Sequence, residues 1–379
     1  MKKILFVSNT ANFQKFNQPF MKQCKEEGWQ VDYASPSDEV LIGCDHFFDI
    51  EMPRNPLNIF KVLKAIQKLK IIIENNMYDV IHCHTPVGSV VARMAAKRQQ
   101  KQGKIKIIYT AHGFHFYKGA PLLNWIIFYP VEKYLSRFTD VLILINNEDY
   151  HIALNKKFKA KQIVKLDGVG VDLNKFSYEK SKKNELRKRF GYSPSDFIIL
   201  YIAEFIPRKN HEFLLNAITE IREKIPNLKL LLPGKGILLE KIKKQAKTLG
   251  LNDIINFIGY SKEINNLCNI SDLYVTTSHQ EGLPISVIEA MACGLPIIAS
   301  NIRGQNDVII DGRNGYLYEQ NNVKQFCDYI LEISNNHFLK DEMTHNNLND
   351  VRKYSLDIAL NKMNKIYSEV ENKYINGKQ

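Results

Sequence analysis

The sequence predicts an α/β protein made of two Rossmann-like, doubly wound domains that face a cleft. Short apolar runs, typical of buried strands, alternate with helix-length segments over most of the 379 residues. The alternation is interrupted near residue 170 and restarts near residue 197, and the chain is long enough to form two separate cores. Ligands of such parallel sheets bind beyond the carboxyl ends of the strands.

In the first half of the chain, apolar and β-branched runs predict strands at residues 3–9, 31–34, 79–84, 105–110 and 141–145. Helices are predicted at 20–27, 59–73, 87–98 and 121–136. The helix from residue 59 shows apolar positions at helical spacing, and the segment 121–136 is unusually apolar.

The second half repeats the pattern after a glycine-containing break at 168–172 and a charged, polar segment at 175–189. Strands are predicted at 197–202, 228–232, 254–260, 273–275, 296–299 and 315–318, with helices at 212–224 and up to 248, and a mostly helical end from 323. We therefore assign a first domain to 1–172, a linker to 173–192, a second domain to 193–355, and a helical tail to 356–379 that can pack back on the first domain; the family resemblance described below implies that the first domain binds the acceptor and the second the donor.

Positive charge is concentrated in the first half of the chain. Residues 1–190 hold 31 basic and 18 acidic side chains, whereas residues 191–379 hold 21 and 22. This excess favours an anionic partner, such as a membrane surface, a phosphorylated substrate or nucleic acid. Nucleic-acid binding would need basic residues interleaved with exposed aromatics, and most aromatics here lie in apolar runs, so we expect no nucleic-acid partner.

The six cysteines are scattered without a Cys-x-x-Cys pair, which predicts reduced thiols in the cytosol and no metal site. No apolar run is long enough to span a bilayer. Lys2 and Lys3 lead directly into a predicted strand, which is unlike a signal peptide.

The stretch from Ser278 to Pro296 has the strongest chemical signal. It predicts a buried helix between two strands, with Pro284 at the first helical position. Glu289 lies inside this apolar helix, where a carboxylate without a partner costs several kcal/mol, on the order of an isolated buried charge. Glu281 and Gly282 precede the helix, where free backbone N–H groups and the helix dipole attract anions. A diphosphate at this tip would place a ribose one turn deeper, about 5.4 Å away, beside Glu289.

The string from Glu281 to Pro296 resembles the donor-site signature of the retaining glycosyltransferases of glycosyltransferase family 4. That signature is Glu, seven residues, Glu, then Ala-Met-Ala-x-Gly-x-Pro, and it is matched here in full. The resemblance implies a GT-B fold and transfer of a sugar, with retention, from a nucleoside diphosphate, for which UDP is expected. It also implies that Glu281 contacts the sugar hydroxyls and is a catalytic residue, and that Glu289 contacts the ribose.

The resemblance extends to the loop after the first strand of the second domain. The family carries Gly-Arg-Leu, a short gap and then Lys at this place, and Lys209 matches the lysine that contacts the diphosphate, which implies a catalytic role. Glu204 replaces the family arginine, which is a departure from the pattern. Arg208 is the adjacent cation available to supply the missing charge.

Further donor-binding residues are implied at the strand ends and at the helix tip of the second domain: Gly234, Ile258, Gly259, Gly282, Leu283 and Pro284. Gly234 belongs to a lone Gly-x-Gly, which is a weak signal by itself. The segment around Ile258 resembles the one whose backbone contacts the base in the family, a form of recognition that needs no particular side chain.

His112 is the predicted catalytic residue of the first domain. It follows the strand 105–110, and the family commonly has a His-Gly pair here, near the donor sugar. Three other histidines invite a metal site together with His112, namely His82, His84 and His115. No carboxylate is placed to complete such a site, and the family typically needs no metal, so no cofactor is expected. The loop after Asn9 lacks the frequent Gly-Gly pattern, which leaves the acceptor open.

Together these observations predict a glycosyltransferase of bacterial surface-polysaccharide assembly, cytoplasmic and peripheral at the inner face of the plasma membrane. Its expected partners are a nucleotide sugar, a lipid-linked or saccharide acceptor, and an anionic membrane surface. The membrane contact is predicted at Lys61, Lys64 and Lys68, which share one helical face, and at the apolar segment Trp125–Phe128. The residues leave two alternatives open: a nucleotide-sugar epimerase of the same fold and a non-enzymatic nucleic-acid binder.

Overall fold

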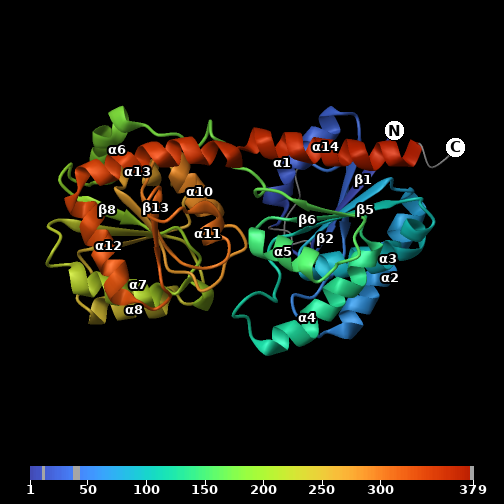
Figure 1. Ribbon diagram of the computed structural model, residues 1–379, viewed down its shortest axis with the longest axis horizontal. Coiled ribbons are helices and arrows are strands. Elements are labelled where there is room, and N and C mark those ends of the chain that lie inside the picture. Colours follow the sequence, from blue (N-terminus) through green and yellow to red (C-terminus); the bar gives the residue numbers. More distant parts are fainter. Residues whose placement is uncertain (11–12, 37–42, 376–379) are drawn as a thin grey trace. The chain divides into compact units, whose positions relative to one another are not determined.

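The computed structural model describes residues 1–10, 13–36 and 43–375. The chain divides into two compact units, one formed by Met1–Gly170 together with Asp357–Gln379 and the other by Val171–Leu356. Each unit is built around one sheet covered by helices (Figure 1). All strand pairings within the described residues are parallel.

The first unit has a seven-stranded sheet of order β3-β2-β1-β4-β5-β6-β7. Its strands are β1 (Lys3–Val7), β2 (Gln30–Ser35), β3 (His46–Asp49), β4 (Val80–His84), β5 (Lys106–Ala111), β6 (Val141–Leu144) and β7 (Gln162–Lys165). The helices of this unit are α1 (Gln14–Glu26), α2 (Ile59–Asn76), α3 (Pro86–Lys101), α4 (Leu122–Leu135), η2 (Ser136–Phe138) and α5 (Asn147–Asn155), with α14 (Leu356–Ile375) from Asp357 onward.

The alternation of side chains along β4 separates the two faces of the first sheet. Ile81 and Cys83 belong to the core cluster that includes residues of α2 and α3. His82 lies on the other face, where its Nδ1 is hydrogen-bonded to the hydroxyl of Tyr367 in α14 at 2.8 Å. His84, the last residue of β4, lies on the same second face, so this strand brings two imidazoles toward the carboxyl edge of the sheet.

The second unit has a six-stranded sheet of order β10-β9-β8-β11-β12-β13. Its strands are β8 (Phe197–Leu200), β9 (Leu228–Pro233), β10 (Ile255–Gly259), β11 (Leu273–Thr276), β12 (Ile297–Ser300) and β13 (Gly315–Tyr318). Its helices are η3 (Lys180–Lys182), α6 (Lys183–Phe190), η4 (Pro207–Lys209), α7 (His211–Ile221), α8 (Leu239–Thr248), α9 (Ile264–Ile270), α10 (Ile285–Ala292), α11 (Gln305–Val308), α12 (Val323–Asn335), α13 (His337–Asp350) and η5 (Val351–Tyr354).

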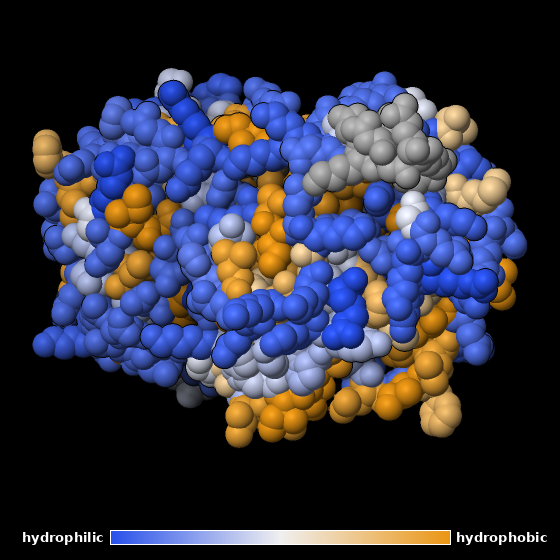
Figure 2. All heavy atoms as spheres, turned by 45° about the vertical axis from the view of Figure 1, so that its right-hand side comes forward, coloured by the Kyte–Doolittle hydropathy of each residue, from blue (hydrophilic) through white to orange (hydrophobic). Residues whose placement is uncertain are grey.

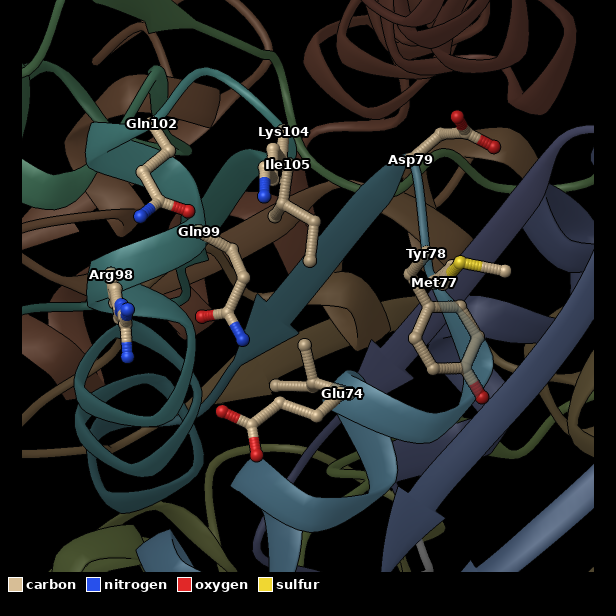
Figure 3. A pocket seen from close by; sticks show the side chains of 10 residues that line it. Glu74, Met77, Tyr78, Asp79, Arg98, Gln99, Gln102, Lys104 and Ile105 are labelled. Atoms are coloured by element: carbon tan, nitrogen blue, oxygen red, sulfur yellow. The ribbon is translucent and has the colours of Figure 1, made fainter.

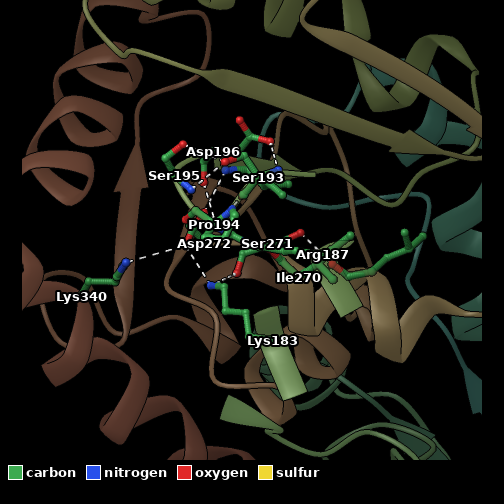
Figure 4. Close-up of polar contacts among 12 residues, drawn as sticks. Lys183, Arg187, Ser193, Pro194, Ser195, Asp196, Ile270, Ser271, Asp272 and Lys340 are labelled. Carbon is green, nitrogen blue, oxygen red and sulfur yellow. Dashed lines mark hydrogen bonds and ion pairs between the residues drawn. The ribbon is translucent and has the colours of Figure 1, made fainter. Parts of the chain in front are cut away.

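The segment 173–192, predicted to be a linker, belongs instead to the second unit. It contains α6, in which Arg187 is 3% exposed and donates to the Asp272 carboxylate at 2.6 Å. Lys183 donates to the same carboxylate at 2.8 Å, and Lys340 lies nearby (Figure 4). The linker prediction was wrong because charged composition does not distinguish a solvated linker from a helix whose cations converge on one buried carboxylate.

The strands predicted from the sequence are all present, although their ends differ by a few residues. The elements that the sequence patterns missed are β3, β7, α5, α6, α9 and α11, none of which exceeds nine residues. Short elements contain too few residues to establish a periodicity. None of the helices in the described part of the chain combines the length and the apolar character needed to cross a membrane.

Candidate active site

The strand order of the second unit changes direction between β8 and β11, which are neighbours in the middle of the sheet. From β8 the chain proceeds to β9 and β10 on one side, and from β11 to β12 and β13 on the other. The loops that leave β8 and β11 therefore diverge at the carboxyl edge of the sheet. Such a switch point is where open parallel sheets bind their ligands.

Three hydrogen bonds from Thr277 and His279 fasten these two loops together, and one from Tyr201 closes the β8 loop on itself. Tyr201 donates its hydroxyl to the Lys209 carbonyl at 2.7 Å, and Thr277 donates its hydroxyl to the Lys209 and Asn210 carbonyls at 3.0 Å each. The His279 N–H donates to the Arg208 carbonyl at 2.8 Å. The short helix η4 is thus held by its backbone, which leaves the side chains of its two cations to point into the site.

Both cations of η4 bind one carboxylate. Lys209 Nζ lies 2.5 Å from Glu281 Oε1, and Arg208 Nη1 lies 2.9 Å from Glu281 Oε2. Burial alone would raise the pKa of Glu281, but the charges of Lys209 and Arg208 outweigh it and hold the pKa below its usual value. Glu281 is therefore ionised and orients two positive charges next to the start of α10. Arg208 and Lys209 are thus two cations paired with one carboxylate.

The helix α10 (Ile285–Ala292) begins one residue later than predicted, so Pro284 is its N-cap residue and not its first helical residue. It ends before Gly294, whose φ of +71° is the left-handed conformation that commonly stops a helix. Glu289 lies in its second turn, surrounded by protein except for a small exposed area. Among the described residues, no hydrogen bond or ion pair reaches its carboxylate.

Because Glu289 has no partner among the described residues, its pKa is displaced in the opposite direction to that of Glu281. Burial raises the pKa of Glu289 to about 7, with the charge of Lys175 as the opposing influence. Two carboxyl groups on one short stretch thus have pKa values displaced in opposite directions. Such divergence is typical of functional sites, since a structural carboxylate at this cost would be expected to have a partner.

The loops after β9 and β10 approach the β8 loop closely. A Cβ on Gly234 would lie 1.9 Å from the Ala203 carbonyl oxygen, so only glycine fits there. The Gly234 N–H donates to the Gly259 carbonyl at 2.8 Å. Ile258 is skipped where the register of the edge strand β10 shifts against β9. The predicted residues Gly234, Ile258 and Gly259 are thereby brought together at the same edge of the sheet.

Two residues after β12 were missed by the sequence analysis. Arg303 is 6% exposed, and its Nε donates to the Glu281 carbonyl at 3.2 Å. A Cβ on Gly304 would lie 2.4 Å from the Gly282 carbonyl oxygen. Arg303 and Gly304 thus contact the backbone of the loop before α10. Gly282 and Leu283 of this loop remain partly exposed. The signal that could have found them is an Arg-Gly pair shortly after a predicted strand of the donor domain.

In the first unit, His112 directly follows β5 and is partly exposed. Its Nε2 is hydrogen-bonded to Nδ1 of His84 at 3.2 Å, and Phe13 packs edge-on against its ring at a centroid distance of 4.5 Å. Burial lowers the pKa of His112 to about 3, so the imidazole is neutral at neutral pH. Ala11 and Asn12, which belong to the loop after Asn9 discussed above, lie outside the described residues.

The rings of three of the four histidines lie in a row, with centroids 4.2 Å apart for His82 and His84 and 5.5 Å apart for His84 and His112. His82 uses both ring nitrogens in hydrogen bonds, to Tyr367 and to Thr110. His115 is exposed and stacks on Phe128 at 4.6 Å. Within the described residues, no group of three or more His, Cys, Asp or Glu side chains is arranged to hold a metal ion.

A groove of about 530 Å³ lies elsewhere in the first unit, between the C-terminal parts of α2 and α3 (Figure 3). Asp79 and Ile105, which line it, directly precede β4 and β5. The groove is therefore at the amino ends of these strands, the edge opposite to the one where parallel sheets bind their ligands. None of the predicted site residues lines it.

Comparison with known proteins agrees with this geometry. Residues 182–350 match the family described as "Glycosyl transferases group 1", and residues 3–147 match the family described as "Glycosyl transferase 4-like". The Bacillus subtilis protein named "Putative glycosyltransferase EpsD" is 38% identical over 334 residues, which cover 88% of this chain and 87% of that protein. The UDP-Gal:alpha-D-GlcNAc-diphosphoundecaprenol alpha-1,3-galactosyltransferase of Escherichia coli is 27% identical over 319 residues, covering 83% and 80%.

Among solved structures, HepE of Anabaena in complex with UDP and glucose superposes with a TM-score of 0.78. It covers 97% of this chain and 100% of its own length at 18% identity, so the likeness concerns the fold. The relatives and the fold lead to one assignment. The chain belongs to the group 1, family 4-like glycosyltransferases, and it is a glycosyltransferase of the GT-B fold.

Proposed function

We propose that this enzyme binds a UDP-sugar in the second unit and transfers the sugar with retention to a lipid-linked acceptor. One observation supports the donor site above all others: Glu281 holds Arg208 and Lys209 beside the start of α10, and Glu289 lies further along this helix without a partner. A diphosphate fits the two cations and the helix N-terminus, and ribose hydroxyls are the donors that Glu289 lacks. HepE, of the same fold, binds UDP and glucose.

Binding of the donor would redistribute the ion pairs of the free enzyme. Lys209 and Arg208 would turn to the diphosphate, which frees the Glu281 carboxylate to accept hydrogen bonds from the sugar hydroxyls. In the transfer step the bond between the sugar C1 and the diphosphate oxygen breaks, and a bond from the acceptor oxygen to C1 forms on the same face. The acceptor proton passes to the departing diphosphate, whose charge the two cations stabilise. His112 contributes a contact to the donor sugar.

A lipid-linked acceptor requires that the enzyme reach a membrane surface, and the first unit offers an apolar face for it. Large exposed apolar side chains gather near the start of α2 and on α4, a set that we call the apolar rim: Leu57, Ile59, Phe60, Leu63, Leu122, Leu123 and Ile126. Figure 2 shows hydrophobic side chains along the lower edge of the molecule, where Figure 1 places α4. The name of the E. coli relative specifies a diphosphoundecaprenol acceptor.

The structure modifies the membrane contact that the sequence predicted. Trp125 points inward and donates its indole N–H to the Tyr117 carbonyl, and Phe128 packs on His115. The most exposed large apolar residues of α4, namely Leu122, Leu123 and Ile126, belong to the apolar rim. Lys61 is exposed but forms an ion pair with Glu51, which offsets part of the charge of its helix face. Apolar insertion by the rim therefore contributes beside the lysines.

The donor assignment is tested by incubating the purified protein with a panel of nucleotide sugars and measuring slow donor hydrolysis without acceptor. We expect a UDP-sugar to be hydrolysed, and the Glu289→Gln variant to lose this activity. Isothermal calorimetry with UDP supplies the binding arm. Absence of UDP binding, or equal binding of all nucleoside diphosphates, would contradict the choice of UDP. Accumulation of an epimerised sugar nucleotide in place of hydrolysis would favour epimerisation.

A further inference from the structure

A second histidine, His84, contacts the predicted catalytic His112 and has no role in the function described so far. It is 1% exposed at the last position of β4. Its Nδ1 and Nε2 of His112 share one hydrogen bond of 3.2 Å. Its own Nε2 is buried and finds no hydrogen-bond partner among the described residues. Among the described residues, the side chain of His84 thus has one hydrogen bond, and its partner is His112.

The unpartnered nitrogen decides which imidazole donates. Both rings are neutral, because burial lowers the pKa of His112 to about 3 and that of His84 well below its usual value. A neutral imidazole has one N–H and one bare nitrogen. If His112 donated to His84, the proton of His84 would lie on its buried Nε2, where it has no acceptor. If His84 donates, only a lone pair is left buried on its Nε2, and the N–H without a protein partner lies on Nδ1 of the partly exposed His112, which is not among the buried unpartnered atoms of the described residues. This is the less costly arrangement, since a buried N–H without an acceptor is rarer than an unsatisfied acceptor.

We infer that His84 is a positioning residue that donates from Nδ1 to Nε2 of His112 and thereby fixes the proton of His112 on its Nδ1. The hydrogen bond made by one ring nitrogen sets the tautomer of the other. Among the described residues, Nδ1 of His112 makes no hydrogen bond. His112 therefore presents a fixed N–H donor to an oxygen of the substrate and does not act as a proton acceptor. The substrate contact rests on the proposed function, whereas the tautomer does not.

The surroundings hold this pair in one orientation. Phe13 packs against both rings, at 4.5 Å from His112 and 5.5 Å from His84, and Phe6 stacks on His84 at 6.2 Å. Restricted rings keep the hydrogen bond in a single geometry. His82, two residues earlier on the same face, provides a matched control: it is equally buried, but its two nitrogens are bonded to Tyr367 and Thr110.

The tautomer is tested directly by long-range proton–nitrogen NMR of the full-length protein, with the His112 signals assigned by His112→Gln. We expect a protonated Nδ1 and a bare Nε2 on His112. In His84→Leu, which has no donor, we expect this preference to be lost, whereas His84→Asn should retain it because its amide nitrogen can occupy the place of Nδ1. His82→Asn should leave the proton of His112 on its Nδ1. A protonated Nε2 on His112 in the wild type would overturn the inference.

The kinetic arm separates positioning from a general structural role. His84→Leu should lower kcat about 10- to 100-fold, the usual effect of losing a group that orients a functional side chain, and leave the KM for the nucleotide sugar unchanged. His84→Asn should restore most of this loss. In a His112→Ala background, His84→Leu should have no further effect, and an equal loss in both backgrounds would contradict positioning. Full activity of His112→Ala would refute the proposed role of His112 and leave the NMR result to decide the tautomer.

Discussion

Replacement of Glu289 by glutamine should stabilise the free enzyme and at the same time weaken nucleotide binding. The free carboxyl has a pKa of about 7 instead of the usual 4.5 because burial disfavours its charge. At ~1.36 kcal/mol per pKa unit this difference corresponds to about 3 kcal/mol, and the small exposed area of the side chain makes this an upper value.

The sign follows from the linkage between protonation and folding. Below pH 4.5 the Glu289 carboxyl is protonated in both the folded and the unfolded chain and costs nothing. As the pH rises through 7 the folded chain must ionise it without a partner, so stability is lost. Glu289→Gln should therefore match the wild type near pH 4 and exceed it by about 2–3 kcal/mol near pH 8.5, measured by urea unfolding with the second-unit transition resolved.

Nucleotide binding should change in the opposite direction. A hydrogen bond to a charged group contributes about 1.5–3 kcal/mol, so the variant should bind UDP about 10- to 100-fold more weakly at pH 8 by calorimetry. The wild-type affinity should fall as the pH drops below 7, and the variant measured in the same buffers should not show this additional fall. Destabilisation at pH 8.5 together with unchanged UDP affinity would show that Glu289 is an ordinary core residue.

Four further outcomes are expected. Glu281→Gln should destabilise the free enzyme at neutral pH, and this effect should fade on acidification because the pKa of Glu281 is lowered. The variant should also reduce turnover while its UDP affinity persists. An equal loss of turnover and of UDP affinity would mean that Glu281 contacts the nucleotide and not the sugar alone. Lys209→Ala should reduce kcat by roughly two to three orders of magnitude, the scale of losing one preorganised contact to developing charge. Arg208→Ala should show a comparable loss, and full activity in single-turnover assays would exclude it as the second cation. In co-sedimentation, the wild type should bind anionic but not neutral vesicles. The double variant Phe60→Glu/Ile126→Glu of the apolar rim and the triple variant Lys61/Lys64/Lys68→Glu should each weaken this binding. Binding equal to the wild type in both variants would favour a soluble acceptor.

The sequence by itself determined the fold class, five of the seven strands of the first sheet and the six strands of the second. Apolar runs of strand length, separated by helical segments, leave few arrangements other than parallel sheets, because each strand must be buried on both faces. The helix with Glu281 at its tip and Glu289 within it was also visible locally, since spacing along one helix fixes which residues lie a turn apart. His112 was found because it lies at the carboxyl end of a predicted strand and begins a His-Gly pair of the kind that the resembled family commonly carries.

Only the tertiary structure decided what these residues contact. Glu281 meets Arg208 and Lys209, 73 and 72 residues earlier in the chain, because β8 and β11 are neighbours in the sheet, and strand order is not encoded in local periodicity. Likewise, the charges of the segment 173–192 converge on Asp272 only after folding. His84 meets His112 because β4 and β5 pair in register. Electrostatic state depends on such partners and on burial, which arise from contacts between residues distant in sequence.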